Sequence, residues 1–143
     1  MQSRRSTLRA CTALALAAFL CGCLPSEQED AASEDPYSAP LTVQLRGVVA
    51  GVIGEGILLQ NHSPEALENV EIVINPGASG GGFRFRTERI DSNSTKSYTG
   101  RVFRNDAGLS FEDADVEPNS FAVYADTPRG RGSWAGQYGP AGN

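Results

Sequence analysis

Apolar and polar side chains alternate over much of the chain from residue 41 onward. Leu41, Val43 and Leu45, for example, are separated by Thr42 and Gln44. A period of two places successive side chains on opposite faces, and it is typical of half-buried β-strands. The pattern predicts about seven strands, at residues 41–45, 56–61, 70–74, 83–86, 96–103, 121–123 and 132–138.

Turn-forming residues separate the predicted strands at short spacing. Gly, Pro, Asn and Asp suit positions where the backbone reverses or takes a positive φ. The one helical signal is Ser63-Pro64-Glu65, where Ser63 suits a helix N-cap and Pro64 suits the first helical position. We expect a single helical turn there. The turn clusters lie at residues 54–56, 75–77, 91–94, 104–108 and 127–130.

Short strands, regular turns and the lack of a long amphipathic pattern predict an all-β fold. About seven strands within residues 41–138 favour an immunoglobulin- or fibronectin-like Greek-key sandwich over an eight-stranded closed barrel. Four segments resemble small uncharacterised immunoglobulin-like domains of bacterial secreted proteins and lipoproteins. This resemblance implies no function, because sandwiches host many unrelated ones. The four segments are residues 57–61, 67–74, 103–111 and 121–130.

The start of the chain follows a different pattern. Three arginines stand among the first nine residues, and residues 10–20 are apolar except for Thr12. The apolar stretch is shorter than the ~20 residues that cross a bilayer, and the combination is typical of an export signal peptide. Residues 3–8 also resemble a twin-arginine signal, with Thr7 where that family prefers phenylalanine. The Sec and twin-arginine routes therefore both stay open.

The end of this signal, Leu20-Cys21-Gly22-Cys23, resembles the lipobox of bacterial lipoproteins. The resemblance implies that the Cys23 thiol accepts the lipid and that the chain is cut before it. Cys21 fits less well, because Ala18 replaces the leucine three positions upstream. The alternative is an ordinary secretory signal with a chance cysteine at its cleavage site. Leu24, in place of an aspartate, implies sorting to the outer membrane, facing the periplasm, if the host has two membranes.

Removal of the signal changes the composition of the chain. Loss of its three arginines moves the formal net charge from −5 to −8, which disfavours nucleic acid as a partner. Negative charge also disfavours anionic head groups, so we expect lipid on Cys23 to hold the protein at a membrane. Cys11 and Cys21 leave with the signal, so the sequence predicts no disulfide and stability from packing alone.

Residues 24–40 are rich in Pro, Ser, Ala and acids and contain no basic residue. Such a segment buries little surface and repels itself. The predicted organisation is a signal peptide at residues 1–22, an acidic disordered tether at 23–40, a β-sandwich at 41–138 and a disordered tail at 139–143.

Catalytic patterns are weak throughout the sequence. His62 is the one histidine and lies in a predicted turn, so a multi-histidine metal site is excluded. The glycine-rich stretch at residues 77–82 is followed by Phe83-Arg84, where a phosphate loop needs Lys and then Ser or Thr. We therefore expect a hairpin connection there, no enzyme activity and no cofactor.

Two groups of side chains are candidates for ligand binding. Arg84 and Arg86 share one face of a predicted strand and suit a carboxylate or phosphate, including those of lipids and polysaccharides. The alternative is solvated strand arginines paired with Glu88 or neighbouring residues. Trp134 and Tyr138, with Tyr124, suit an aromatic patch for sugar or protein. The alternative is that Trp134 caps the core.

The run from residue 112 to residue 117 offers four carboxylates that suit calcium in an extracellular loop. The alternative is a solvated acidic loop. The carboxylates belong to Glu112, Asp113, Asp115 and Glu117.

We expect a lipid-anchored envelope protein that acts as a non-catalytic interaction or structural module. Its partner would be another envelope protein, contacted through a sheet edge or loops. A glycan- or calcium-binding module is the alternative. A hydrolase is the third possibility and would need His62 beside an acid and a nucleophile.

Overall fold

Strands make up nearly all of the regular structure in residues 35–138, the part of the chain that this computed structural model describes. Two short 3-10 turns, η1 (Pro36–Ser38) and η2 (Gly100–Val102), accompany them. Within this part, none of the helical segments is long and apolar enough to cross a membrane. The eight strands are β1 (Val43–Gln44), β2 (Val48–Ile53), β3 (Gly56–Asn61), β4 (Leu67–Ile74), β5 (Phe83–Ile90), β6 (Ser94–Thr99), β7 (Ser120–Thr127) and β8 (Gly130–Gln137).

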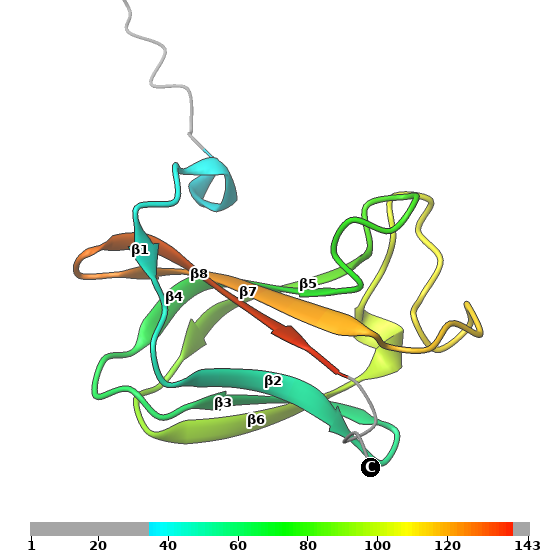
Figure 1. The fold of residues 1–143 in the computed structure, drawn as a ribbon, viewed down its shortest axis with the longest axis horizontal. Helices are drawn as coiled ribbons and strands as arrows, with labels where there is room; N and C mark the ends of the chain where they lie inside the picture. The colour runs from blue at the N-terminus through cyan, green and yellow to red at the C-terminus, as the bar shows by residue number, and fades with distance from the viewer. Residues whose placement is uncertain (1–34, 139–143) are drawn as a thin grey trace, which may run out of the picture. The chain divides into compact units, whose positions relative to one another are not determined.

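The strands form two sheets, one of five strands in the order β1-β8-β7-β4-β5 and one of three in the order β2-β3-β6. Only the short β1–β8 pair is parallel, and the other pairs are antiparallel. Figure 1 shows the two sheets lying across from each other, with β2, β3 and β6 as one layer. The all-β prediction and its two-sheet form are thus confirmed.

The core lies between the two sheets. In β4, the side chains of Val70, Ile72 and Ile74 are fully buried, as the period of two predicts. In β3, Ile57 and Leu59 alternate with partly exposed neighbours and face the same core. Burial of these apolar side chains is the main source of stability in a domain whose residues 35–138 contain no cysteine.

An aromatic cluster fills one part of this core. Phe85 from β5 lies with its ring centroid 4.7 Å from that of Tyr98 on β6 and 5.5 Å from that of Phe103. The Tyr98 and Phe103 centroids are 6.5 Å apart, with the rings edge to face. Burial raises the pKa of the Tyr98 hydroxyl above its ordinary value of 10.0, although a hydrogen bond with Thr87 acts in the opposite direction.

This raised pKa makes stability fall in alkaline solution. As the pH rises above about 10, the unfolded chain loses the Tyr98 proton while the folded chain still holds it, which favours unfolding. The stabilising contribution is complete below that pH and is lost as the pH rises through the folded-state pKa. Urea titrations between about pH 8 and pH 11 should show a smaller loss of stability for Tyr98→Phe than for the wild type. If the wild type and Tyr98→Phe lost the same stability over this pH range, Tyr98 would not be the group responsible for the loss.

The bounds of most strands differ from the sequence-based prediction. The strand predicted at residues 41–45 is β1 (Val43–Gln44), and those predicted at 83–86 and 121–123 extend to Ile90 and Thr127. The sequence analysis missed β2 because Val49 and Ile53 point to solvent and are 45% and 63% exposed, so polar residues do not mark the outer face. The strand predicted at residues 96–103 starts earlier, at Ser94, and ends at Thr99. The chain then turns through η2, where the amide of Phe103 donates to the carbonyl of Gly100 at 3.2 Å.

The helical turn predicted at Ser63-Pro64-Glu65 is wrong. The segment is a bend held by the fully buried Asn61 side chain. Asn61 Oδ1 accepts from the amide and the hydroxyl of Ser63, at 3.1 and 2.7 Å. Asn61 Nδ2 donates to the carbonyls of Glu65 and Asp91, at 2.9 and 3.0 Å. Ser63 therefore bonds to an asparagine side chain instead of capping a helix.

Part of the segment expected to be a tether has a defined place on the sandwich. Asp35 caps η1 by accepting from the amide of Tyr37 at 3.0 Å. Residues 39–42 then lead into β1, and η1 contacts β4. The predicted signal peptide, Cys23, the rest of the tether and the tail at residues 139–143 lie outside the described residues.

Candidate functional site

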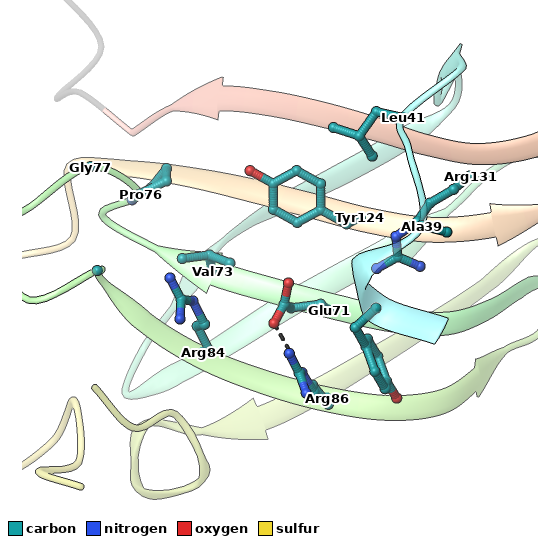
Figure 2. A pocket seen from close by; sticks show the side chains of 12 residues that line it. Ala39, Leu41, Glu71, Val73, Pro76, Gly77, Arg84, Arg86, Tyr124 and Arg131 are labelled. Atoms are coloured by element: carbon teal, nitrogen blue, oxygen red, sulfur yellow. Dashed lines mark hydrogen bonds and ion pairs between the residues drawn. The ribbon is translucent and has the colours of Figure 1, made fainter. Parts of the chain in front are cut away.

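A groove with a volume of about 500 Å³ crosses the face of the five-stranded sheet that points away from the core. We call it the outer groove. Strands β4, β5, β7 and β8, the segment before β1 and the loop after β4 all contribute to it (Figure 2). It is lined by Tyr37, Ala39, Leu41, Glu71, Val73, Pro76, Gly77, Gly81, Arg84, Arg86, Tyr124 and Arg131.

Sheet register brings the central residues of the groove together. Glu71 of β4 pairs with Arg86 of β5 on one side and with Tyr124 of β7 on the other. Val73 pairs with Arg84. Because paired residues share a face of a sheet, all five side chains lie opposite the core-facing positions. The floor of the groove is therefore β4, with the two arginines along one side and Tyr124 along the other (Figure 2).

As predicted, Arg84 and Arg86 share one face of a strand. Neither of them pairs with Glu88; each has another acidic partner. Arg86 Nε donates to Glu71 Oε1 at 3.0 Å, and its guanidinium carbon lies 4.3 Å from the centre of the Tyr37 ring. Arg84 Nη1 donates to Asp106 Oδ1 at 3.2 Å. Both arginine side chains remain about half exposed, at 45% and 47%, so both can reach a ligand.

Arg89 lies apart from the outer groove. It pairs with Glu68 and with Asp91, and its hydrogen bond to Asp91 holds the pKa of that carboxyl below the ordinary value. Of the three arginines of β5, Arg84 and Arg86 line the outer groove and Arg89 does not.

Arg131 is a groove residue that the sequence analysis missed. Its side chain is 2% exposed, and Nη1 donates to Asp126 Oδ1 at 2.9 Å and to the Asn69 carbonyl at 3.2 Å. Asn69 lies in β4 where the pairing register with β7 shifts, and its φ is +46°. The carbonyl that accepts from Arg131 therefore belongs to an irregular position of the strand. Arg131 Nη2 is buried, and no described residue accepts a hydrogen bond from it.

Arg129 lies in the turn before β8, stays exposed and pairs with Glu65 at 3.4 Å. Arg131 lies within β8 opposite Asp126 of β7 and is buried. The position of β8 beside β7 thus brings Arg131 into the groove.

Tyr37 covers two arginines of the outer groove. The guanidinium carbons of Arg86 and Arg131 lie 4.3 and 5.6 Å from its ring centre, which fits a cation–π arrangement on both. The sequence analysis placed Tyr37 in the tether and so did not consider it.

The three aromatic residues proposed as one patch do not meet. Trp134 pairs with Val123, is partly buried and packs against the core, as in the alternative interpretation. Tyr138 is 45% exposed, and its ring lies edge to face with Phe121 at 6.4 Å. Tyr124 pairs with Ser133 and lies on the opposite face, in the outer groove. A shared Trp134–Tyr138–Tyr124 patch is therefore wrong.

The acidic run does not form a cluster of ligands. Glu112 Oε1 accepts from Arg101 at 3.0 Å, and Asp113 Oδ2 accepts from the Ser110 hydroxyl at 2.6 Å. Asp115 has a φ of +48°, and the Glu117 carbonyl accepts from Asn75. Within residues 35–138, no three His, Cys, Asp or Glu side chains come together as a metal site would require.

His62 is exposed, and the hydrogen-bond partner of its ring is Gln60 Oε1, at 3.4 Å. The hydroxyl of its neighbour Ser63 is bound to Asn61 and to the Glu65 carbonyl. The described contacts of His62 thus do not include the acid and nucleophile that a hydrolytic triad needs.

Comparisons of this chain with protein-family models, with curated proteins and with solved structures each gave no match. The functional proposals below therefore rest on the residues of the chain itself.

Proposed function

We propose that the chain is an envelope lipoprotein, anchored through Cys23, whose β-sandwich is a non-catalytic binding module. The observation that carries this proposal is the outer groove. It gathers three arginines and one acid, Glu71, as its charged lining in a chain with a formal charge of −5. Exposed arginine forks suit recognition of an anionic partner.

We infer that the sandwich has the immunoglobulin- or fibronectin-like Greek-key arrangement. The chain passes between the sheets from β3 to β4, from β5 to β6 and from β6 to β7. After each return it pairs with an earlier strand, so that β6 lies beside β3 and β7 lies beside β4. Such returns support a Greek key over simple meanders.

If the outer groove is a binding site, its arginines favour an anionic ligand over calcium. The arginines would repel a cation, and no three His, Cys, Asp or Glu side chains come together within residues 35–138. The proposed partner is therefore an anionic component of the envelope, either a protein or a glycan.

The anchor is tested by expressing the full chain with Cys23→Ala in a host that lipidates proteins. We expect the wild type to partition with membranes and to incorporate labelled fatty acid, whereas Cys23→Ala should do neither, because the lipid on Cys23 is the proposed attachment. Cys21→Ala is the matched control and should behave like the wild type. If Cys23→Ala still partitioned with membranes and incorporated as much labelled fatty acid as the wild type, the proposed anchor at Cys23 would be wrong.

The role of the outer groove is tested by cross-linking and co-purification from detergent-solubilised envelope. We expect a partner with the wild type and its loss with Arg84→Gln/Arg86→Gln. Arg101→Gln is the matched control, because Arg101 is exposed and does not line the groove. Recovery of the same partner with the double variant, or of the lipoprotein alone with the wild type, would contradict the proposed role.

A further inference from the structure

We propose that the outer groove binds an acidic sugar residue, a uronate, with its carboxylate on Arg84 and Arg86 and its ring against Tyr124. This inference rests on the proposed function and names the ligand of the same site. It joins three properties of the groove: its exposed arginines, its aromatic wall and its buried donor.

The two exposed arginines of the groove favour an anion. Arg84 and Arg86 lie two residues apart on β5, and their half-exposed guanidinium groups point into the groove (Figure 2). The pairs Arg84–Asp106 and Arg86–Asp35 are exposed and contribute only about 0–1 kcal/mol each. A ligand carboxylate can therefore replace them at little cost, while Arg86 keeps its 3.0 Å hydrogen bond to Glu71.

The far wall of the groove suits a sugar ring. Tyr124 lies across the groove from the arginine pair and is only partly buried, so the C–H face of a sugar can rest against its ring. Val73, which lies between them, is 3% exposed and offers almost no surface. A bare phosphate would not use the Tyr124 ring. The volume of about 500 Å³ lies in the ~300–1,000 Å³ range of small-ligand pockets.

A buried donor and a buried acceptor suit the hydroxyl groups of such a ring. Arg131 Nη2 has no acceptor among the described residues, and a buried donor without a partner is costly. A sugar oxygen would satisfy it once the Tyr37 ring, whose centre lies 5.6 Å from the Arg131 guanidinium carbon, moves aside. Glu71, whose side chain is 12% exposed, offers carboxylate oxygens that accept from hydroxyls.

Sheet geometry disfavours an extended acidic peptide in the same place. Strand β4 pairs with β5 on one side and with β7 on the other, so its backbone groups are used in the sheet. A peptide lying over this face would not find the free strand edge that β-augmentation needs. A ligand rich in hydroxyls, recognised by side chains alone, matches the groove better.

The test measures binding of digalacturonate to the full lipoprotein in detergent by calorimetry. Its dimethyl ester, which removes only the charge, is the matched ligand, and inorganic phosphate and a Glu-Glu dipeptide represent other anions. We expect the ester to bind at least about tenfold more weakly, because charge-assisted hydrogen bonds are lost. Phosphate and the dipeptide should also bind more weakly than digalacturonate.

Variants then locate the site. Arg84→Gln/Arg86→Gln should weaken digalacturonate binding about tenfold or more, and Tyr124→Ala should weaken it while leaving the thermal midpoint near that of the wild type. Arg101→Gln should bind like the wild type. Equal binding of acid and ester, equal binding of phosphate or dipeptide, or unchanged binding by the groove variants would each overturn the inference.

Failure of this inference can be told apart from failure of the proposed function. If digalacturonate does not bind but an envelope partner is still lost with Arg84→Gln/Arg86→Gln, the uronate assignment is wrong and the groove remains the binding site. If neither the sugar nor the envelope partner depends on these arginines, both proposals are wrong.

Discussion

Phe103→Ala is expected to lower the free energy of unfolding by about 3–5 kcal/mol. Phe103 is fully buried, and its ring centroid lies 5.5 Å from that of Phe85 and 6.5 Å from that of Tyr98. Alanine at this position removes a whole ring from the core and leaves a cavity. Typical domains are stable by only about 5–15 kcal/mol, and residues 35–138 have no cysteine for a disulfide.

Urea denaturation of the full chain, followed by circular dichroism, measures this loss. Val102→Ala is the matched control, because Val102 is the adjacent residue and is 41% exposed. An exposed substitution of this kind changes stability by about 0.5 kcal/mol or less. Similar losses for Val102→Ala and Phe103→Ala would show that the 3-10 turn, and not the buried ring, determines stability here.

The sequence indicates this fold well where one face of a strand meets water. In β5, Phe83 and Phe85 alternate with Arg84 and Arg86, and the structure has a strand there. The period fails where exposed positions are apolar, as at Val49 of β2. Exposed apolar residues are common on protein surfaces, so a polar outer face cannot be assumed for every strand.

The candidate site is only partly predictable, because local spacing and sheet order contribute differently to it. A separation of two residues suffices to place Arg84 and Arg86 on one face. Arg131 and Tyr124 join them only because β8 and β7 lie beside β4, which depends on contacts between residues distant in sequence. The aromatic residues illustrate the same limit: Trp134 and Tyr124 lie on opposite faces because of the β7–β8 register.

The loops are the least predictable part of the chain, because single side chains determine their conformation. Asn75 has a φ of +53°, and its Oδ1 accepts from the amides of Asn119 and Ser120, at 2.7 and 3.3 Å. In the sequence, Asn75 is recognisable only as a turn former. Its role in joining the end of β4 to the start of β7 depends on a segment more than forty residues away.

Asn61→Ala is the second substitution for which we expect a large effect, a loss of about 3 kcal/mol. The Asn61 side chain is fully buried and makes four hydrogen bonds to two loops. Alanine leaves the Ser63 amide and the carbonyls of Glu65 and Asp91 without these partners in a partly buried place. Asn119→Ala is the matched control, because the Asn119 side chain is exposed and makes one bond, at 3.4 Å.

Asn61→Asp separates the accepting role of this side chain from its donating role. Aspartate keeps the oxygen that accepts from Ser63, but at neutral pH it faces the carbonyls of Glu65 and Asp91 with a charged oxygen in place of the amide donor. Since an uncompensated buried charge costs more than a lost hydrogen bond, Asn61→Asp should be at least as destabilised as Asn61→Ala in urea titrations at neutral pH. A stability near that of the wild type would mean that only the contacts with Ser63 hold the loop. A loss as large as for Asn61→Ala shows that the two carbonyls need a donor, so that one buried amide joins the loop after β3 to the loop after β5.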